Sequence, residues 1–145
     1  MASAASPAKH DDVLVVREIW DVPLSGVTLF EGGFYSFQRV YDEEAQGWPQ
    51  SREFMLQRLT GEELAQFNEL HERTNAWLEA YKKGNAGPHP LTPEAAGPDA
   101  DRYKDLHQKT EAILFSDTDR TIRCIGDISL HPDKTRYIAL WQRLI

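Results

Sequence analysis

The period of the hydrophobic pattern changes twice along this chain of 145 residues, and each change marks a change in secondary structure. Between residues 13 and 59, short apolar runs rich in β-branched and aromatic residues are separated by Gly and Pro, which is typical of strands. Between residues 61 and 115, apolar residues recur as they do on one face of a helix. After residue 120 the β-rich runs return. This order predicts an α+β fold, an antiparallel sheet with two helices packed on one face between N-terminal and C-terminal strands.

The β-rich runs predict strands that are joined by tight turns. The sequence Glu-Gly-Gly at 31–33 separates two of these runs, and its glycines can adopt the positive φ that a hairpin requires. The last run also fits a helical stripe, and we assign it as a strand. The predicted strands are Val13–Trp20, Val27–Phe30, Phe34–Tyr41, Glu53–Leu59, Thr121–Leu130 and Thr135–Leu144.

Two helices are predicted from capping and periodicity. Thr60 followed by Glu63 has the form of a capping box, in which the two side chains satisfy backbone donors at a helix start. The first helix is expected over about Gly61–Lys83 and the second over about Asp99–Phe115. Between them, residues 84–98 contain four prolines and three glycines, which exclude a long regular element. A loop of this length inside a compact domain is expected to be packed, functional or mobile.

Composition restricts the partners and the compartment. Asp and Glu number 23 against 16 Lys and Arg, so nucleic acid and anionic membrane surfaces are expected to be repelled. Cys124 is the single cysteine, which fits a reducing cytoplasm, and its β-rich surroundings predict a core position. Residues 1–12 lack the features of a signal peptide, and we expect a disordered tail before a single domain at 13–145. No apolar run approaches the roughly 20 residues of a membrane helix.

Several motifs occur in an order that resembles a known group of proteins. The sequence WDVPLSG is followed by an aromatic strand that runs into YDEE, by a helix that carries Trp77, and by HPLTPEAAGPDADRYKDL. Over about Arg17–Leu106 the chain therefore resembles a group of uncharacterised small bacterial proteins with a WD-x-P-x-SG start and an HP-x-LP-type loop. This resemblance implies a bacterial cytoplasmic protein, and it implies no activity and no catalytic residue.

Aromatic residues are the most conspicuous binding candidates. Trp20 and Asp21 together offer an indole platform and a carboxylate acceptor, although a core cap and a turn are the simpler interpretation. One predicted strand carries aromatic residues on both faces, whereas a half-exposed strand should be polar outside. If the chain itself does not cover the second face, the aromatic patch marks an interaction site. The aromatic residues of this strand are Phe34, Tyr35, Phe37 and Tyr41.

Histidines are the candidates for metal or proton chemistry. His71 and His107 lie at the edges of the two helical stripes, and Glu111 follows His107 by one turn, which is a conceivable two-His, one-carboxylate site. No HExxH motif accompanies them, so boundary positions are the simpler interpretation. His89 and His131 each precede proline, which favours an extended backbone, and we expect them to shape loops. His89 is also a binding candidate because it lies in the 84–98 loop.

The sequence therefore predicts a small cytoplasmic binding protein. It is expected to engage a protein partner, or a second copy of itself, through the aromatic hairpin face or the 84–98 loop. No catalytic residue and no cofactor are expected, because no phosphate-binding loop, nucleophile elbow or dinucleotide fingerprint occurs. Two alternatives are a metal-dependent hydrolase that uses the helix histidines and a domain that binds a small ligand between the sheet and the helices.

Overall fold

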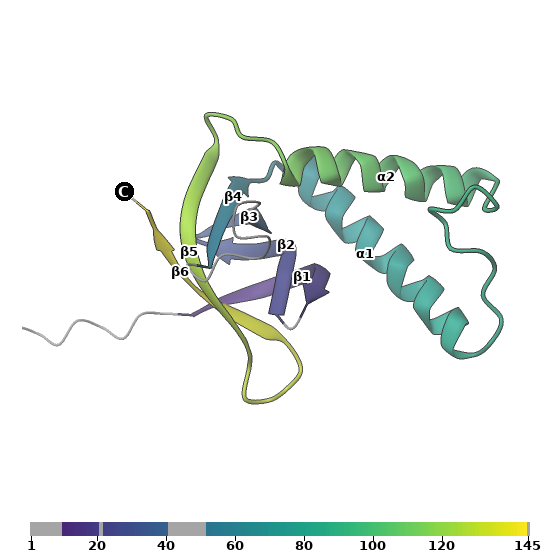
Figure 1. Cartoon of the computed structure of the whole chain (residues 1–145), viewed down its shortest axis with the longest axis horizontal. Coiled ribbons are helices and arrows are strands. Elements are labelled where there is room, and N and C mark those ends of the chain that lie inside the picture. The colour runs from purple at the N-terminus through teal and green to yellow at the C-terminus, as the bar shows by residue number, and fades with distance from the viewer. Residues whose placement is uncertain (1–9, 21, 41–51, 145) are drawn as a thin grey trace, which may run out of the picture. The chain divides into compact units, whose positions relative to one another are not determined.

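The computed structural model describes residues 10–20, 22–40 and 52–144, and the chain forms two compact units (Figure 1). The barrel unit comprises the residues up to Leu59 and from Leu114 onward, and the helical unit comprises Thr60–Ile113. The elements are, in chain order, β1 (Asp11–Trp20), β2 (Val22–Phe30), β3 (Gly33–Arg39), β4 (Glu53–Arg58), α1 (Gly61–Lys82), α2 (Pro98–Leu114), β5 (Thr121–Leu130) and β6 (Tyr137–Arg143).

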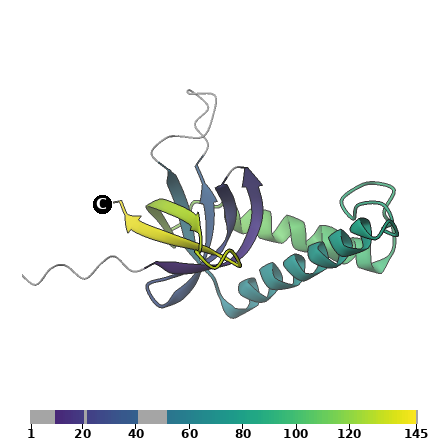
Figure 2. The ribbon, with the colours of Figure 1, turned by 90° about the horizontal axis from the view of Figure 1, so that it is seen from below.

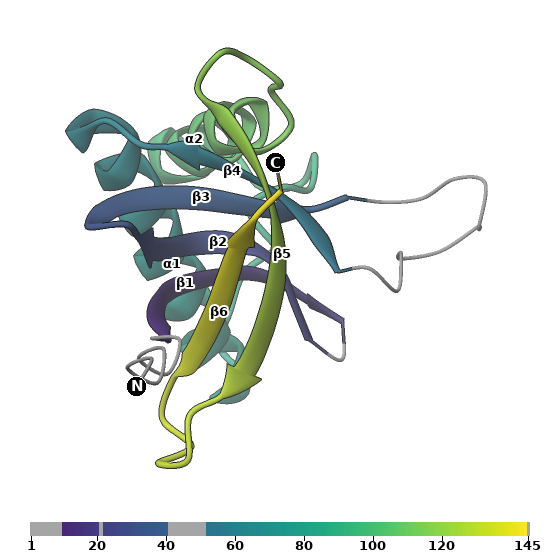
Figure 3. The same ribbon diagram turned by 90° about the vertical axis from the view of Figure 1, so that its left-hand side faces the viewer.

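The strands form a closed antiparallel barrel in the order β1-β2-β3-β4-β5-β6. Closure depends on β1, which pairs with β2 along its length and with β6 over Asp11–Val13. Figure 3 shows β5 and β6 crossing β1, β2 and β3. The prediction of an open sheet with two helices packed on one face is therefore wrong. Alternation along a strand shows which side chains share a face, but it does not show whether the first and last strands pair.

Irregularities in β1 bend it enough to join both neighbours. Its register against β2 shifts at three places, between Val13 and Val15, between Val16 and Glu18, and between Glu18 and Ile19. Bulges of this kind increase the local twist and bend a strand, and they are frequent at the rims of barrels. The paired part of β1 begins at Asp11, two residues before the predicted start of the strand.

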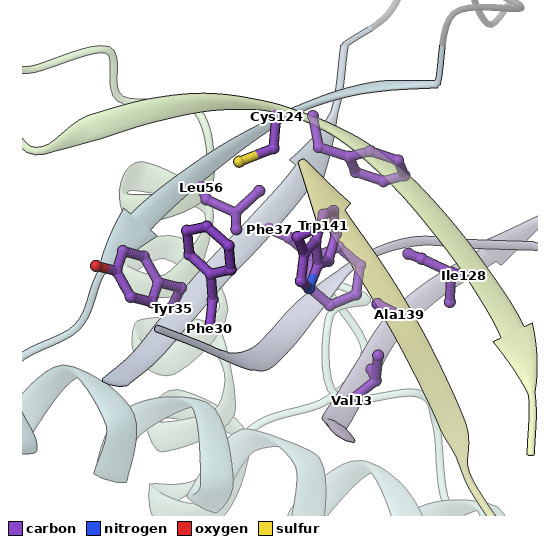
Figure 4. Close-up of a cluster of buried hydrophobic side chains, with 10 residues drawn as sticks. Val13, Phe30, Tyr35, Phe37, Leu56, Cys124, Ile128, Ala139 and Trp141 are labelled. Atoms are coloured by element: carbon purple, nitrogen blue, oxygen red, sulfur yellow. The ribbon is translucent and has the colours of Figure 1, made fainter. Parts of the chain in front are cut away.

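The barrel interior is filled by aromatic side chains (Figure 4). The Trp141 ring lies 5.6 Å from the ring of Phe37 and 5.2 Å from that of Phe54, measured between centroids. Its indole N–H donates to Thr28 Oγ1 at 3.0 Å, so the polar edge of the ring is satisfied inside the barrel. The core cluster is Val13, Phe30, Tyr35, Phe37, Phe54, Leu56, Cys124, Ile128, Ala139 and Trp141.

Cys124 belongs to this core, which confirms the sequence interpretation. Burial raises the pKa of its thiol to about 11. The thiol is therefore protonated at neutral pH, and a protonated thiol is a poor nucleophile.

Most local predictions are confirmed, but β2 begins at Val22 and not at the predicted Val27, so Pro23 and Gly26 lie inside a strand. β2 and β3 form the expected hairpin, and the turn residues Glu31 and Gly32 adopt φ of 47° and 75°. The ambiguous C-terminal run is a strand, because Ala139 and Trp141 alternate toward the core while it pairs with β5.

The helical unit begins at the predicted capping box. Thr60 Oγ1 accepts from the backbone N–H of Glu63 at 3.1 Å, and the Glu63 carboxylate accepts from the backbone N–H of Thr60 at 2.9 Å. Leu70 on α1 packs with Tyr103 and Leu106 on α2, which gives this unit a core of its own. Among the described residues, no helix has the length and apolar character needed to cross a membrane.

Substituting Gly126 by alanine is expected to destabilise the barrel. An added Cβ would lie 2.3 Å from the Trp141 ring and 3.0 Å from the Phe54 ring, and both rings are held in the core. Overpacking of this kind costs about 1–3 kcal/mol. Chemical denaturation should show this loss for Gly126→Ala. The control Gly61→Ala, where nothing lies within 4 Å of the added atom, should show no loss.

Candidate functional site

The structure places the predicted aromatic hairpin residues in different environments. Phe37 and Tyr35 point into the barrel core, with 0% and 5% of their surface exposed, so neither ring is available to a partner. Phe34 is 41% exposed on the opposite face. Trp20 ends β1, and nothing further is described of its side chain. Asp21 and Tyr41 lie outside the described residues.

The helix histidines do not converge on a metal site. His107 Nε2 lies 3.7 Å from a carboxylate oxygen of Glu111, one turn away on α2, as the spacing predicts. His71 instead contacts Asn75 Nδ2 on its own helix at 3.2 Å. In the described part of the chain, no three His, Cys, Asp or Glu residues are grouped as metal ligands.

A cleft in the helical unit involves a predicted functional segment, the 84–98 loop. It has a volume of about 690 Å³ and lies among α1, the 84–98 loop and the start of α2. Small and rigid apolar residues form much of its lining, and charged side chains lie among them. The lining residues are Arg73, Ala76, Gly87, Pro88, Pro90, Glu94, Ala95, Ala96, Asp99, Ala100 and Tyr103.

Three aromatic rings fix the loop to the helices next to this cleft. The His89 ring packs edge-on against Trp77 of α1, with 4.9 Å between centroids, and against Tyr103 of α2, with 5.8 Å between centroids. The Trp77 indole N–H donates to the carbonyl of Gly87 at 3.3 Å, and the Tyr103 hydroxyl contacts Thr74 Oγ1 at 2.9 Å. His89 therefore shapes the loop, as expected before proline, and it does so from inside an aromatic cluster.

Backbone hydrogen bonds give the loop a defined path. His89 Nδ1 accepts from the backbone N–H of Leu91 at 3.1 Å, and the His89 carbonyl accepts from the Thr92 hydroxyl at 2.7 Å. The Lys104 ammonium of α2 donates to the Ala95 carbonyl at 2.9 Å. The loop is held at His89 and Ala95 although most of its residues are exposed, and the cleft that it lines is preformed.

A shared carboxylate joins the two helices beside the cleft. Glu69 of α1 accepts from Arg102 of α2 at 2.7 and 2.9 Å, and from Arg73 at 2.8 Å. These hydrogen bonds, of which those from Arg102 have the largest effect, lower the pKa of the Glu69 carboxyl to about 2. Arg73 is thereby directed along the cleft wall, with its Nη1 atom 3.9 Å from Asp99.

The two carboxylates of the cleft are open to solvent. Asp99 has a fully exposed side chain, and its ion pair with Arg73 is long. Glu94 is exposed, and no described residue forms a hydrogen bond or an ion pair with it. The helical unit as a whole has ten acidic and six basic side chains. The cleft therefore presents negative charge around an apolar floor.

Sequence reasoning identified part of this site. It indicated the 84–98 loop and His89. It did not indicate Ala76 or Ala100, because an alanine in a helix does not mark the lining of a cleft.

Comparison with models of known protein families, with curated protein sequences and with solved structures found no match to this chain.

Replacing Glu69 by glutamine is expected to change how stability depends on pH. The folded-state pKa of about 2 lies below the ordinary value of 4.5, so the carboxylate stabilises the fold above about pH 4.5. That contribution is lost as the pH falls toward 2. Urea unfolding at several pH values in this window should show a weaker acid destabilisation for Glu69→Gln than for the original protein. Glu72→Gln, the same substitution at an exposed position of α1, is the matched control.

Replacing His89 by alanine is expected to loosen the loop. The change removes two ring contacts and the acceptor of the Leu91 N–H, and a single hydrogen bond contributes about 1 kcal/mol. Hydrogen exchange measured by NMR should show at least about fivefold faster exchange for the Leu91 and Thr92 amides. His131→Ala is the matched control, because His131 also precedes proline and accepts from a backbone N–H two residues ahead. Unchanged exchange in His89→Ala would show that the aromatic cluster does not hold the loop.

Proposed function

We propose that the chain is a binding protein that holds an extended, basic segment of a protein partner in the cleft lined by the 84–98 loop. The observation that carries this proposal is the preformed cleft of about 690 Å³, floored by small residues and edged by two unpaired or weakly paired carboxylates. The proposal keeps one of the two surfaces expected from the sequence, the loop. The other surface is less suited, because Tyr35 and Phe37 are buried.

The dimensions of the cleft suit a peptide segment. Its volume lies within the range of about 300–1000 Å³ that is typical of ligand sites. The alanines at 76, 95, 96 and 100 bring the floor close to the backbone, so an extended chain can lie against it. Because the loop is already ordered, binding does not require the loop to lose conformational freedom, and this lowers the cost of association.

The charge of the cleft favours a basic partner. Glu94 and Asp99 face solvent at its edge, whereas Arg73 is engaged by Glu69. Lys or Arg side chains in the bound segment would complement these carboxylates. The net negative charge of the chain would also attract a basic partner at longer range.

Exposed apolar side chains extend the surface next to the aromatic cluster. Tyr81 stacks on Trp77 with 5.2 Å between centroids, yet 64% of its surface is exposed. Leu91, which follows the lining residue Pro90, is 40% exposed. Exposed aromatic side chains of this kind are enriched at protein interfaces. They provide apolar contacts that a free metabolite would not need.

A cytoplasmic setting is part of the proposal. Cys124 is a free thiol in the barrel core, which suits a reducing compartment, and the acidic composition makes nucleic acid an unfavourable partner. A metal-dependent hydrolase is less favoured, because the described His71 does not join His107 and Glu111.

Peptide binding to isotopically labelled full-length protein tests the proposal. The probes are two libraries of capped hexapeptides, one with two Lys or Arg residues per peptide and one with two Asp or Glu residues. Basic peptides are expected to shift the amide signals of Ala76, Ala95 and Ala96, and acidic peptides are not. Ala96→Trp should weaken binding more than about tenfold by filling the cleft, and Glu94→Lys should weaken it about threefold, as a surface ion pair would.

The matched controls lie on the helices away from the cleft. Ala112→Trp places the same bulk at an exposed position of α2, and Glu72→Lys reverses an exposed charge on α1. Both should bind like the original protein. Shifts confined to other surfaces, equal response to the two libraries, or full binding by Ala96→Trp would each overturn the proposal.

A further inference from the structure

A second concave surface lies on the outer face of the barrel unit. It has a volume of about 280 Å³. Four consecutive antiparallel pairings, from β1 to β5, place one side chain per strand in a row across the sheet. In order, the row is Glu18, Ser25, Gln38, Met55 and Arg123. All of these except Ser25 line the pocket, together with Arg39, Val40 and Phe115.

The centre of this row contains an unsatisfied acceptor. Gln38 is only 3% exposed, and its Nε2 donates to the Arg39 carbonyl at 3.1 Å. No described residue donates to its Oε1, and the neighbouring Ser25 Oγ is likewise buried with no described partner. Buried polar groups are nearly always hydrogen-bonded, because a buried donor or acceptor without a partner has lost its hydrogen bonds to water.

Gln57 shows how the same residue type is satisfied on this barrel. It lies on the next strand, β4, and is 4% exposed. Its Oε1 accepts from the Ser116 hydroxyl at 2.8 Å. Burial of a glutamine on the outer face therefore does not by itself leave its acceptor unmatched. Gln38 differs from Gln57 in that its acceptor has no described partner and the residue lines a pocket.

Opposite charges lie on either side of this acceptor. The Glu18 carboxylate is exposed, two strands from Gln38 on one side. The Arg123 guanidinium lies two strands away on the other side. It contacts Asp117 at 3.3 Å and Glu53 at 3.9 Å, which leaves part of its five-donor fork for another anion. Strands are about 4.8 Å apart, so the backbones of Glu18 and Arg123 are separated by roughly 20 Å. Both residues line the pocket between them.

We infer that this pocket binds a free α-amino acid in its zwitterionic form, with an apolar side chain. The ammonium would donate to Gln38 Oε1 and face Glu18, and the carboxylate would face Arg123. Val40, Met55 and Phe115 supply an apolar surface for the side chain. The volume of about 280 Å³ lies just below the range of drug-sized ligand sites, which suits a molecule of this size. The site belongs to the barrel unit and is independent of the peptide cleft.

Calorimetric titration of the full-length protein with L-leucine, L-methionine and L-phenylalanine tests the inference. At least one of the three is expected to bind with one-to-one stoichiometry. Its methyl ester, which lacks the carboxylate, and its N-acetyl form, which lacks the ammonium, should each bind at least about tenfold more weakly. No binding by any of the three, or equal binding of either derivative, would overturn the inference.

Two glutamine variants separate binding from folding. Gln38→Leu should lose at least about tenfold in affinity while the melting temperature is retained or raised, because an unmatched acceptor is removed. Gln57→Leu should lower the melting temperature and leave the affinity unchanged. Gln108→Leu, at an exposed position of α2, replaces this control if Gln57→Leu does not fold. Full affinity in Gln38→Leu would also overturn the inference.

Discussion

The pairing of β1 with β6 is the contact on which the barrel depends. Three residues at the start of β1 pair with three in β6, from Asp11 opposite Ala139 to Val13 opposite Tyr137. Without this pairing, β1 and β6 would be edge strands with unpaired backbone groups, and edges of this kind invite association. Closure removes both edges. It also fixes the space that the core side chains must fill.

The interior of a closed barrel of six strands is narrow, and here aromatic rings fill it. Trp141 is accommodated because position 126 is glycine, where any Cβ would lie 2.3 Å from the indole. The Thr28 hydroxyl satisfies the indole N–H, so the polar edge of the largest ring has a partner inside the barrel. Eight strands give an interior just wide enough to be filled by side chains or to hold one small ligand. A narrower barrel filled with rings has less interior space for a ligand, and the pocket proposed at Gln38 lies on the outer surface.

Most secondary structure could be predicted from the sequence because the signals for it are local. The capping box at Thr60, the hairpin turn at Gly32 and the periodicity of the helices each depend on residues within a few positions of one another. Barrel closure could not be predicted in this way, because it joins Asp11 to Ala139. The cleft was predicted in part, since prolines and His89 marked the loop. Ala76 and Ala100 became recognisable as lining only once the path of the loop was known.

The position of the helical unit in the chain explains how one protein can combine a filled barrel with the surface that we propose recognises a partner. α1 and α2 are inserted between β4 and β5, yet these strands pair directly, from Glu53 opposite Ile125 to Gln57 opposite Thr121. The helical unit is therefore one long connection between two strands that pair with each other. The entropic cost of closing such a connection rises only slowly with its length. Because the helical unit has its own core of Leu70, Tyr103 and Leu106, substitutions that reshape its cleft need not disturb the pairing of the strands.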